Sequence, residues 1–389
     1  MTQTPTIQEI FNQRYHELFL DVRAAQANLL KADEPILSGI DLEQSKTSRS
    51  LLRVEKQAIR EKNLNQKHAL NYLTENLNQI NIQVEERLIE ELNSTENLYR
   101  KVIGIEDTIP QLLDLLNVKA ATTSRVESLA LELPWFYQDL LKLVNQPKYR
   151  RTDSNGKVIH VDSLRAALNR FGLENLNPVV LSLAFRRWLP QITDPYPQIK
   201  NRLWDEALAT SIVCRKLATL YKVDENHAFN LGMLSLLGNI VVVRLYFRLF
   251  DIVQREALIE SQAKQEHELH DALSRLVPAG EFLTQMLDKY ALPVSAALIT
   301  KMDMKRIFIA NAMQEVASSE SLSESTPLAL VLKQARGYSR YRLLKMYNLI
   351  DMQEAKDYVR TLNLPKGALT SLKTTDIRTL NLQLTNTPN

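Results

Sequence analysis

Glycine is scarce in this chain, with only nine among 389 residues, about 2 % where roughly 7 % is usual. Strand-rich folds use glycine in tight turns, and nucleotide-binding folds use it in loops around phosphate groups. The motifs Gly-x-Gly-x-x-Gly, Gly-x-x-x-x-Gly-Lys-Ser/Thr and Gly-x-Ser-x-Gly are all missing. These absences argue against dinucleotide-binding proteins, phosphate-loop proteins and serine hydrolases. The scarcity of glycine predicts an all-helical protein.

Cysteine is almost absent, because Cys214 is the single one and has no partner for an internal disulfide. It lies in an apolar run with Ile212, Val213 and Leu217, so we expect a buried thiol. The first residues lack the basic and apolar segments of a signal peptide. Residues 231–245 form the most apolar stretch, which is too short and too polar to cross a bilayer. We therefore expect a cytoplasmic protein without membrane insertion.

A strong charge of one sign is also missing, since 48 basic and 45 acidic residues give a net charge of +3. The balance excludes a general affinity for nucleic acids or anionic membranes. Length and a hydrophobic content of 45 % predict a sizeable core in more than one unit. We expect an N-terminal helical region at 1–105, a helical domain at 106–317 and a helical tail at 318–389.

Apolar residues in the N-terminal region recur at three- and four-residue spacing, which predicts amphipathic helices. Pro35 and Gly39 predict a break. Residues 77–92 carry an apolar seam, for which a coiled coil is an alternative, although the seam lacks three clean heptads. Such faces either pack on the rest of the chain or bind a partner.

The middle of the chain is predicted to hold two apolar helices, 203–221 and 226–250, at its buried centre. A charged helix follows at 256–276, and Leu292-Pro293 separates two further helices. Asn155-Gly156 predicts a turn, in what would be the protein's one hairpin. Residues 318–327 are a serine-rich linker, followed by tail helices at 328–347 and 352–362.

The six histidines do not form a zinc-protease pattern, and there is no cysteine cluster. His267, His270 and Asp271 share a helix face, yet they lie in a polar run where exposed side chains are the simpler interpretation.

Three clusters combine cations with aromatic rings: Lys148 to Arg151, Arg186 to Trp188, and Tyr338 to Tyr347. Such clusters can hold phosphate and stack bases. The spacing in the last cluster also fits ordinary helix packing.

Six segments in order resemble the HDOD domain, the HD-related output domain of bacterial signalling proteins. They begin at Ile109-Pro110 and include the helix Leu140–Asn145, the segment Val161–Leu173 and the Trp204 helix. The remaining two run from Ala228 to Gly238 and from Ala279 to Pro293. Together they cover about residues 107–316, and the resemblance implies an HD-superfamily helical fold.

The departures from catalytic relatives concern the metal ligands. The catalytic HD phosphohydrolases, which this chain resembles, hold divalent metal with a His-Asp pair, a histidine upstream and an aspartate downstream. The matching pair here is Ser235 and Leu236. The helix after Trp204 reads Asp205-Glu206-Ala207 without histidine, and Ala279 stands where many relatives keep another histidine. The resemblance thus implies a domain without catalytic residues, metal or other cofactor.

The resemblance implies a regulatory scaffold in bacterial signal transduction that acts through protein–protein contacts, with signalling proteins as partners and self-association open. The alternative is a nucleotide- or nucleic-acid-binding regulator that turns nothing over. A metal-dependent phosphohydrolase is the least favoured class. The sequence has no receiver or diguanylate-cyclase segment, and it does not identify partner-binding residues.

Overall fold

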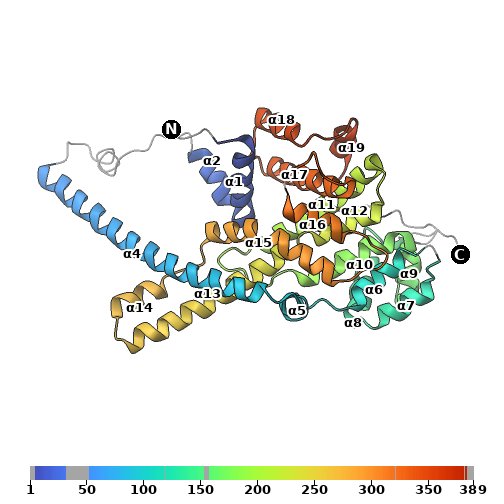
Figure 1. Ribbon diagram of the computed structural model, residues 1–389, viewed down its shortest axis with the longest axis horizontal. Helices are drawn as coiled ribbons and strands as arrows, with labels where there is room; N and C mark the ends of the chain where they lie inside the picture. The colour runs from blue at the N-terminus through green and yellow to red at the C-terminus, as the bar shows by residue number, and fades with distance from the viewer. Residues whose placement is uncertain are drawn as a thin grey trace.

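The computed structural model describes residues 5–31, 52–118, 120–152, 157–319, 321–380 and 382. The predicted break at Pro35 and Gly39 and the turn at Asn155-Gly156 lie outside these ranges. The described chain is all-helical apart from one short hairpin, which confirms the predicted fold class (Figure 1).

The N-terminal region contains one long helix and several short ones. Its elements are α1 (Ile7–Leu20), α2 (Val22–Lys31), α4 (Arg53–Leu92), α5 (Thr95–Asn97) and the π-helix η1 (Leu98–Ile103). Thr6 and Glu9 form a capping box that fixes the start of α1. The seam on α4 buries Ile80, Val84 and Leu88, so the C-terminal part of this helix packs on the rest of the protein.

The middle of the chain supplies most of the helices. In order, they and the hairpin strands are α6 (Thr108–Leu116), α7 (Thr123–Leu131), α8 (Pro134–Val144), β1 (Arg151–Thr152), β2 (Val158–Ile159), α9 (Leu164–Phe171), α10 (Leu173–Trp188), α11 (Ile199–Tyr221), α12 (Glu225–Leu234), α13 (Leu237–Ala263), α14 (His267–Ser274), α15 (Gly280–Lys301) and α16 (Ala310–Ser318). The predicted hairpin is confirmed as an antiparallel pair in which Arg151 faces Ile159.

Three predicted helix boundaries in this region are wrong. The apolar helix expected at 226–250 is interrupted at Ser235-Leu236, between α12 and α13. The charged helix expected at 256–276 is divided, because α13 continues to Ala263 and α14 begins after a turn with Gln265 at positive φ. Pro293 lies inside the continuous helix α15. A proline removes one helical hydrogen bond, and the packing of α15 on α13 supports the helix through that turn.

The buried centre is confirmed, since α12 and the first half of α13 are buried almost throughout. The helical stretch Glu225–Ala263 is long and apolar enough to pass a membrane-span test, but 94 % of its most apolar window is buried inside the protein. Neighbouring helices therefore cover the apolar surface that this stretch carries.

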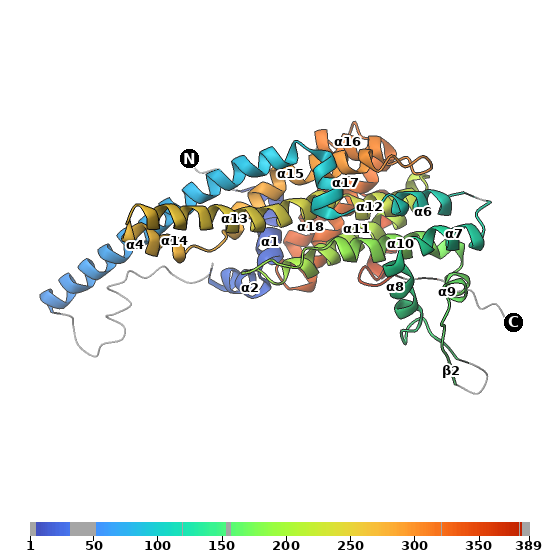
Figure 2. The ribbon, with the colours of Figure 1, turned by 90° about the horizontal axis from the view of Figure 1, so that it is seen from below.

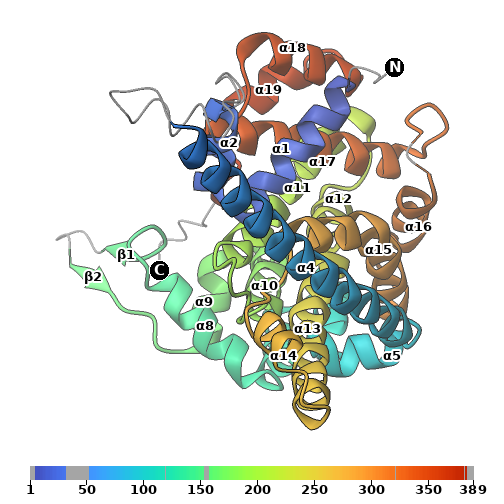
Figure 3. The ribbon, with the colours of Figure 1, turned by 90° about the vertical axis from the view of Figure 1, so that its left-hand side faces the viewer.

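The tail forms α17 (Pro327–Met346), α18 (Met352–Thr361) and α19 (Ala368–Thr374), as predicted. It lies beside the N-terminal helix α1 (Figures 1 and 3). Arg14 of α1 donates two hydrogen bonds to the Glu354 carboxylate, at 2.6 and 2.7 Å. The rings of Phe11 and Tyr358 stack 3.8 Å apart. Buried side chains of all three regions thus form one continuous core.

Candidate functional site

The site that the sequence singles out is the junction of α12 and α13, where Ser235 and Leu236 occupy the position of the His-Asp pair. The Ser235 hydroxyl donates to the carbonyl of Gly232 at 2.8 Å, and Leu236 is fully buried. The Ser295 hydroxyl donates to the carbonyl of Ser235 and accepts from the amide of Gly238, both at 2.8 Å. These bonds satisfy backbone groups that the helix break frees.

Close backbone contacts fix this junction. A Cβ atom on Gly238 would lie 1.8 Å from the carbonyl oxygen of Ala291, and one on Gly232 would lie 2.7 Å from the Cα of Ser211. Only glycine permits α12 to approach α11 and α13 to approach α15 this closely. Gly232 and Gly238 therefore allow the helices around this junction to pack backbone against backbone.

A buried charged cluster lies where α1 and α17 pack on α11. Glu206 of α11 is 1 % exposed, and its carboxylate accepts a hydrogen bond from the Arg340 Nε of α17 at 2.9 Å. Burial acts to raise the pKa of Glu206, but the positive charges of Arg340 and Arg336 outweigh it, so this pKa lies below its ordinary value. Tyr15 of α1 completes the cluster, with its ring 4.5 Å from the Arg340 guanidinium.

These side chains line a cavity of about 420 Å³. Its walls come from α1, α11, α13, α15, α17 and α18, so the N-terminal region, the middle of the chain and the tail all contribute. Asn239 of α13, one turn beyond Leu236, also lines it. Four buried polar atoms of residues that line this cavity lack a hydrogen-bond partner among the described residues: Tyr15 Oη, Glu206 Oε2, Arg336 Nη1 and Asn239 Oδ1.

The residues at this position do not fit the divalent metal of HD phosphohydrolases. Ser235 is committed to a carbonyl, Leu236 has no donor atom, and Glu206 is flanked by two guanidinium groups that repel a cation. Ala279 contributes only its carbonyl, which accepts from the Tyr246 hydroxyl at 2.9 Å.

The histidine group on α14 does not replace this site. His270 Nδ1 lies 3.2 Å from both the Ser261 hydroxyl and the Leu258 carbonyl, and Asp271 pairs with Arg275. Within the described ranges, no three His, Cys, Asp or Glu side chains are grouped to hold a metal ion.

In two of the three clusters of cations and aromatic rings, cations contact rings or carbonyls of neighbouring elements. The Arg186 guanidinium lies 4.1 Å from the Trp204 ring and that of Arg187 lies 4.6 Å from the Trp135 ring. In the tail, Arg342 donates to the Leu372 carbonyl at 2.8 Å. These contacts connect α10 to α8 and α11, and α17 to the end of α19.

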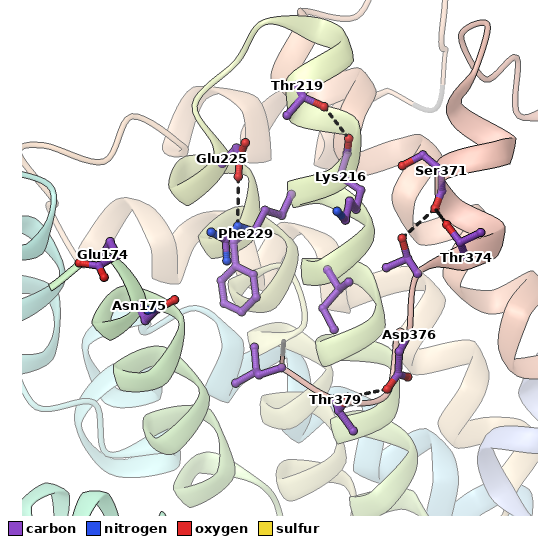
Figure 4. Close-up of a pocket in the computed structure, with 14 residues that line it drawn as sticks. Glu174, Asn175, Lys216, Thr219, Glu225, Phe229, Ser371, Thr374, Asp376 and Thr379 are labelled. Carbon is purple, nitrogen blue, oxygen red and sulfur yellow. Dashed lines mark hydrogen bonds and ion pairs between the residues drawn. The ribbon is translucent and has the colours of Figure 1, made fainter. Parts of the chain in front are cut away.

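Another cavity, of about 930 Å³, opens where α10, α11 and α12 meet the end of the tail (Figure 4). Its cations Arg215 and Lys216 face the carboxylates of Glu174, Glu225 and Asp376. Arg215 already pairs with Glu225 at 3.2 Å. With two cations and three carboxylates in its lining, this cavity has no excess of positive charge.

Residues 104–282 match the family model described as the HDOD domain. The helical fold with its altered His-Asp junction therefore belongs to the HD-related class of domains. Within that class, residues 104–282 form an HDOD domain, as the resemblance at Ala228–Gly238 predicted.

A crystal structure of "Putative phosphohydrolase from Shewanella amazonensis SB2B" is similar to 73 % of this chain and 96 % of that chain, at 16 % sequence identity and a TM-score of 0.41. No curated protein matches the chain. The family assignment accordingly depends on the HDOD match.

Sequence reasoning found part of this site and missed the rest. In the sequence, Glu206 stands out only because its segment lacks a histidine, and Arg340 only because it belongs to a cluster of cations and rings. Tyr15, Arg336 and Asn239 were not identified, because they come from distant parts of the chain or from an apolar run. The available signal was the pair Arg336 and Arg340, four residues apart on one face of α17.

Proposed function

We propose that this HDOD protein is a non-catalytic regulator of bacterial signal transduction that works in the cytoplasm by binding other signalling proteins. The altered junction supports the absence of catalysis, because Ser235 and Leu236 cannot hold a metal that would activate water. The observation that carries the interaction role is the shape and surface of α4.

Helix α4 extends about 60 Å at 1.5 Å per residue, and its first half projects from the body of the protein (Figures 1 and 2). No residue of 53–72 is buried. Val54, Leu64 and Leu70 are 78, 54 and 62 % exposed. Most of the stability of a helix in a protein comes from tertiary packing of its apolar face, which supports a partner that covers these side chains.

Charge indicates the kind of partner. The projecting segment 53–72 carries five basic residues and two acidic ones. A protein surface with an apolar groove bordered by carboxylates would complement it in both charge and hydrophobicity. Exposed leucines favour this partner over nucleic acid, which would use the cations alone.

The interaction is tested with full-length protein carrying Leu64→Gln and Leu70→Gln, since both changes keep a good helix former. The matched control is Ile259→Gln, which removes an equally exposed apolar side chain (69 %) from α13. Cross-linked partners captured from the native cells should be lost with the double variant and kept with the control. Equal capture by both would refute the role of α4, and binding to heparin that weakens steeply with salt would favour the nucleic-acid alternative.

Catalysis is tested separately. The purified protein with added Mn²⁺ or Fe²⁺ should not hydrolyse bis-p-nitrophenyl phosphate. Turnover that accompanies stoichiometric bound metal would overturn the non-catalytic assignment, whatever the outcome for α4.

A further inference from the structure

The cavity at the meeting point of the three regions holds an excess of positive charge. Two guanidinium groups, Arg336 and Arg340, act on the single carboxylate of Glu206. Burial and the neighbouring charge of Arg340 lower the pKa of Arg336, against the attraction of Glu206. An unbalanced charge away from water is costly unless an opposite charge approaches it.

The other titratable groups around the cavity do not supply that charge. Asp288 of α15 lies 3.2 Å from the imidazole Nε2 of His16 on α1. Lys333 of α17 donates to the Ser321 carbonyl and the Ser325 hydroxyl, at 2.7 and 2.9 Å. Asp288 also attracts Arg336, but it is 59 % exposed, so water screens its charge.

Of the four unpartnered polar atoms in the cavity lining, Tyr15 Oη and Glu206 Oε2 belong to side chains that already act on each other. The other two atoms differ in character. Arg336 Nη1 is a cationic donor, and Asn239 Oδ1 is a neutral acceptor on a side chain that is only 5 % exposed. Buried polar groups in native proteins nearly always have partners, including bound molecules. A molecule that satisfies both atoms needs an anionic group for the first and an N–H or O–H group for the second.

The volume is consistent with such a molecule, since cavities from about 300 Å³ upward accept small organic ligands. We propose that this cavity binds a small organic phosphate or carboxylate, with its anionic group on Arg336 and a hydrogen-bond donor on Asn239. The ligand would lie between α1 and α17, so binding would strengthen the docking of the N-terminal helix on the tail. This site is independent of the interaction role of α4.

The first experiment measures the thermal midpoint of the full-length protein with four probes. Guanosine 5′-monophosphate carries a phosphate and N–H donors, L-aspartate carries carboxylates and an ammonium donor, inorganic phosphate supplies the anion alone, and guanosine supplies the donors alone. We expect one of the two organic anions to raise the midpoint in a concentration-dependent way, and guanosine to leave it unchanged. The choice between nucleotide and aspartate distinguishes phosphate from carboxylate recognition.

The second experiment compares affinities by calorimetry. Arg336→Met and Asn239→Leu should each weaken binding of the active probe about tenfold or more, because each removes a buried polar contact. Arg255→Gln, which changes a guanidinium 70 % exposed on α13, should bind as the unchanged protein does. Asn239→Leu changes no charge, so it tests the site even where Arg336→Met fails to fold.

Three results would overturn the proposal. The first is that no probe raises the midpoint at about 10 mM, well above a millimolar dissociation constant. The second is that guanosine binds as tightly as its phosphate. The third is that both cavity variants bind the active probe with unchanged affinity. Protection of residues 7–20 from hydrogen exchange by the active probe would support the predicted effect on α1.

Discussion

Glu206 offers the sharpest test of how the buried cluster contributes to stability. Glu206→Gln keeps the size of the side chain and an acceptor for Arg340 Nε, but it removes the negative charge. Since Glu206 is 1 % exposed, water cannot replace that charge. Both Arg336 and Arg340 then remain in the cavity without a balancing carboxylate.

Removing one partner of a buried ion pair costs about 3–5 kcal/mol. With an m value of about 3 kcal/mol per molar urea, a loss of 3 kcal/mol lowers the unfolding midpoint by about 1 M. Urea unfolding followed by far-UV circular dichroism measures this change. Glu256→Gln is the control, because Glu256 pairs with Arg87 on the surface, and it should shift the midpoint far less.

Arg336→Met is the diagnostic companion to Glu206→Gln. If Arg336 is the unbalanced cation, its removal relieves repulsion with Arg340, and the free energy of unfolding should stay within about 1 kcal/mol of that of the unchanged protein or rise. A loss as large as that of Glu206→Gln would refute the reasoning, because it would show that the charge of Arg336 is needed. A Glu206→Gln protein as stable as the unchanged one would refute it as well.

Three further predictions concern the same centre. The pKa of Glu206 is depressed below its ordinary value of 4.5, so the stability that this carboxylate contributes is complete above about pH 5 and is lost as pH falls through the folded-state pKa. The difference in urea stability between the unchanged protein and Glu206→Gln should therefore shrink below pH 4.5. A difference that grew there would contradict this sign. Gly238→Ala places a methyl group against the Ala291 carbonyl, so it should lose more than about 3 kcal/mol in urea unfolding, whereas Gly337→Ala, which meets a flexible leucine end, should lose less; equal losses would argue against the rigid contact. Burial raises the pKa of the Cys214 thiol, so a thiol reagent should label it only in denaturant, and rapid labelling of the native protein would contradict its burial.

Local patterns predicted much of the fold. Gly172 ends α9 with a positive φ of 72°, a conformation that glycine adopts readily, and the tail helices follow their apolar spacing. The errors at Ser235-Leu236 and Pro293 share a cause, which is that contacts from another helix decide whether a helix continues. Ser295 stabilises the break between α12 and α13 from 60 residues away, and no local pattern contains that bond.

The candidate cavity was less predictable for the same reason. Tyr15, Glu206 and Arg340 come from the three regions that the sequence divides at 105 and 317, and only the tertiary fold brings them together. Each residue had a plausible local role as part of an apolar face, a helix or a cation–ring cluster. Their common function as one buried charge cluster exists only once α1 and α17 pack on α11.

The charge of the candidate cavity is opposite in sign to what a metal centre requires, such as the one in the catalytic HD proteins that this chain resembles. A divalent cation needs several neutral or anionic ligands that face it. Here Arg336 and Arg340 of the tail act on the buried carboxylate of Glu206, and the second carboxylate in the cavity lining, Asp288, is exposed to water. Loss of the His-Asp pair alone would leave an inert core, but the addition of Arg336 and Arg340 creates a field that attracts anions. The tail therefore supplies both guanidinium groups of the proposed anion-binding cavity.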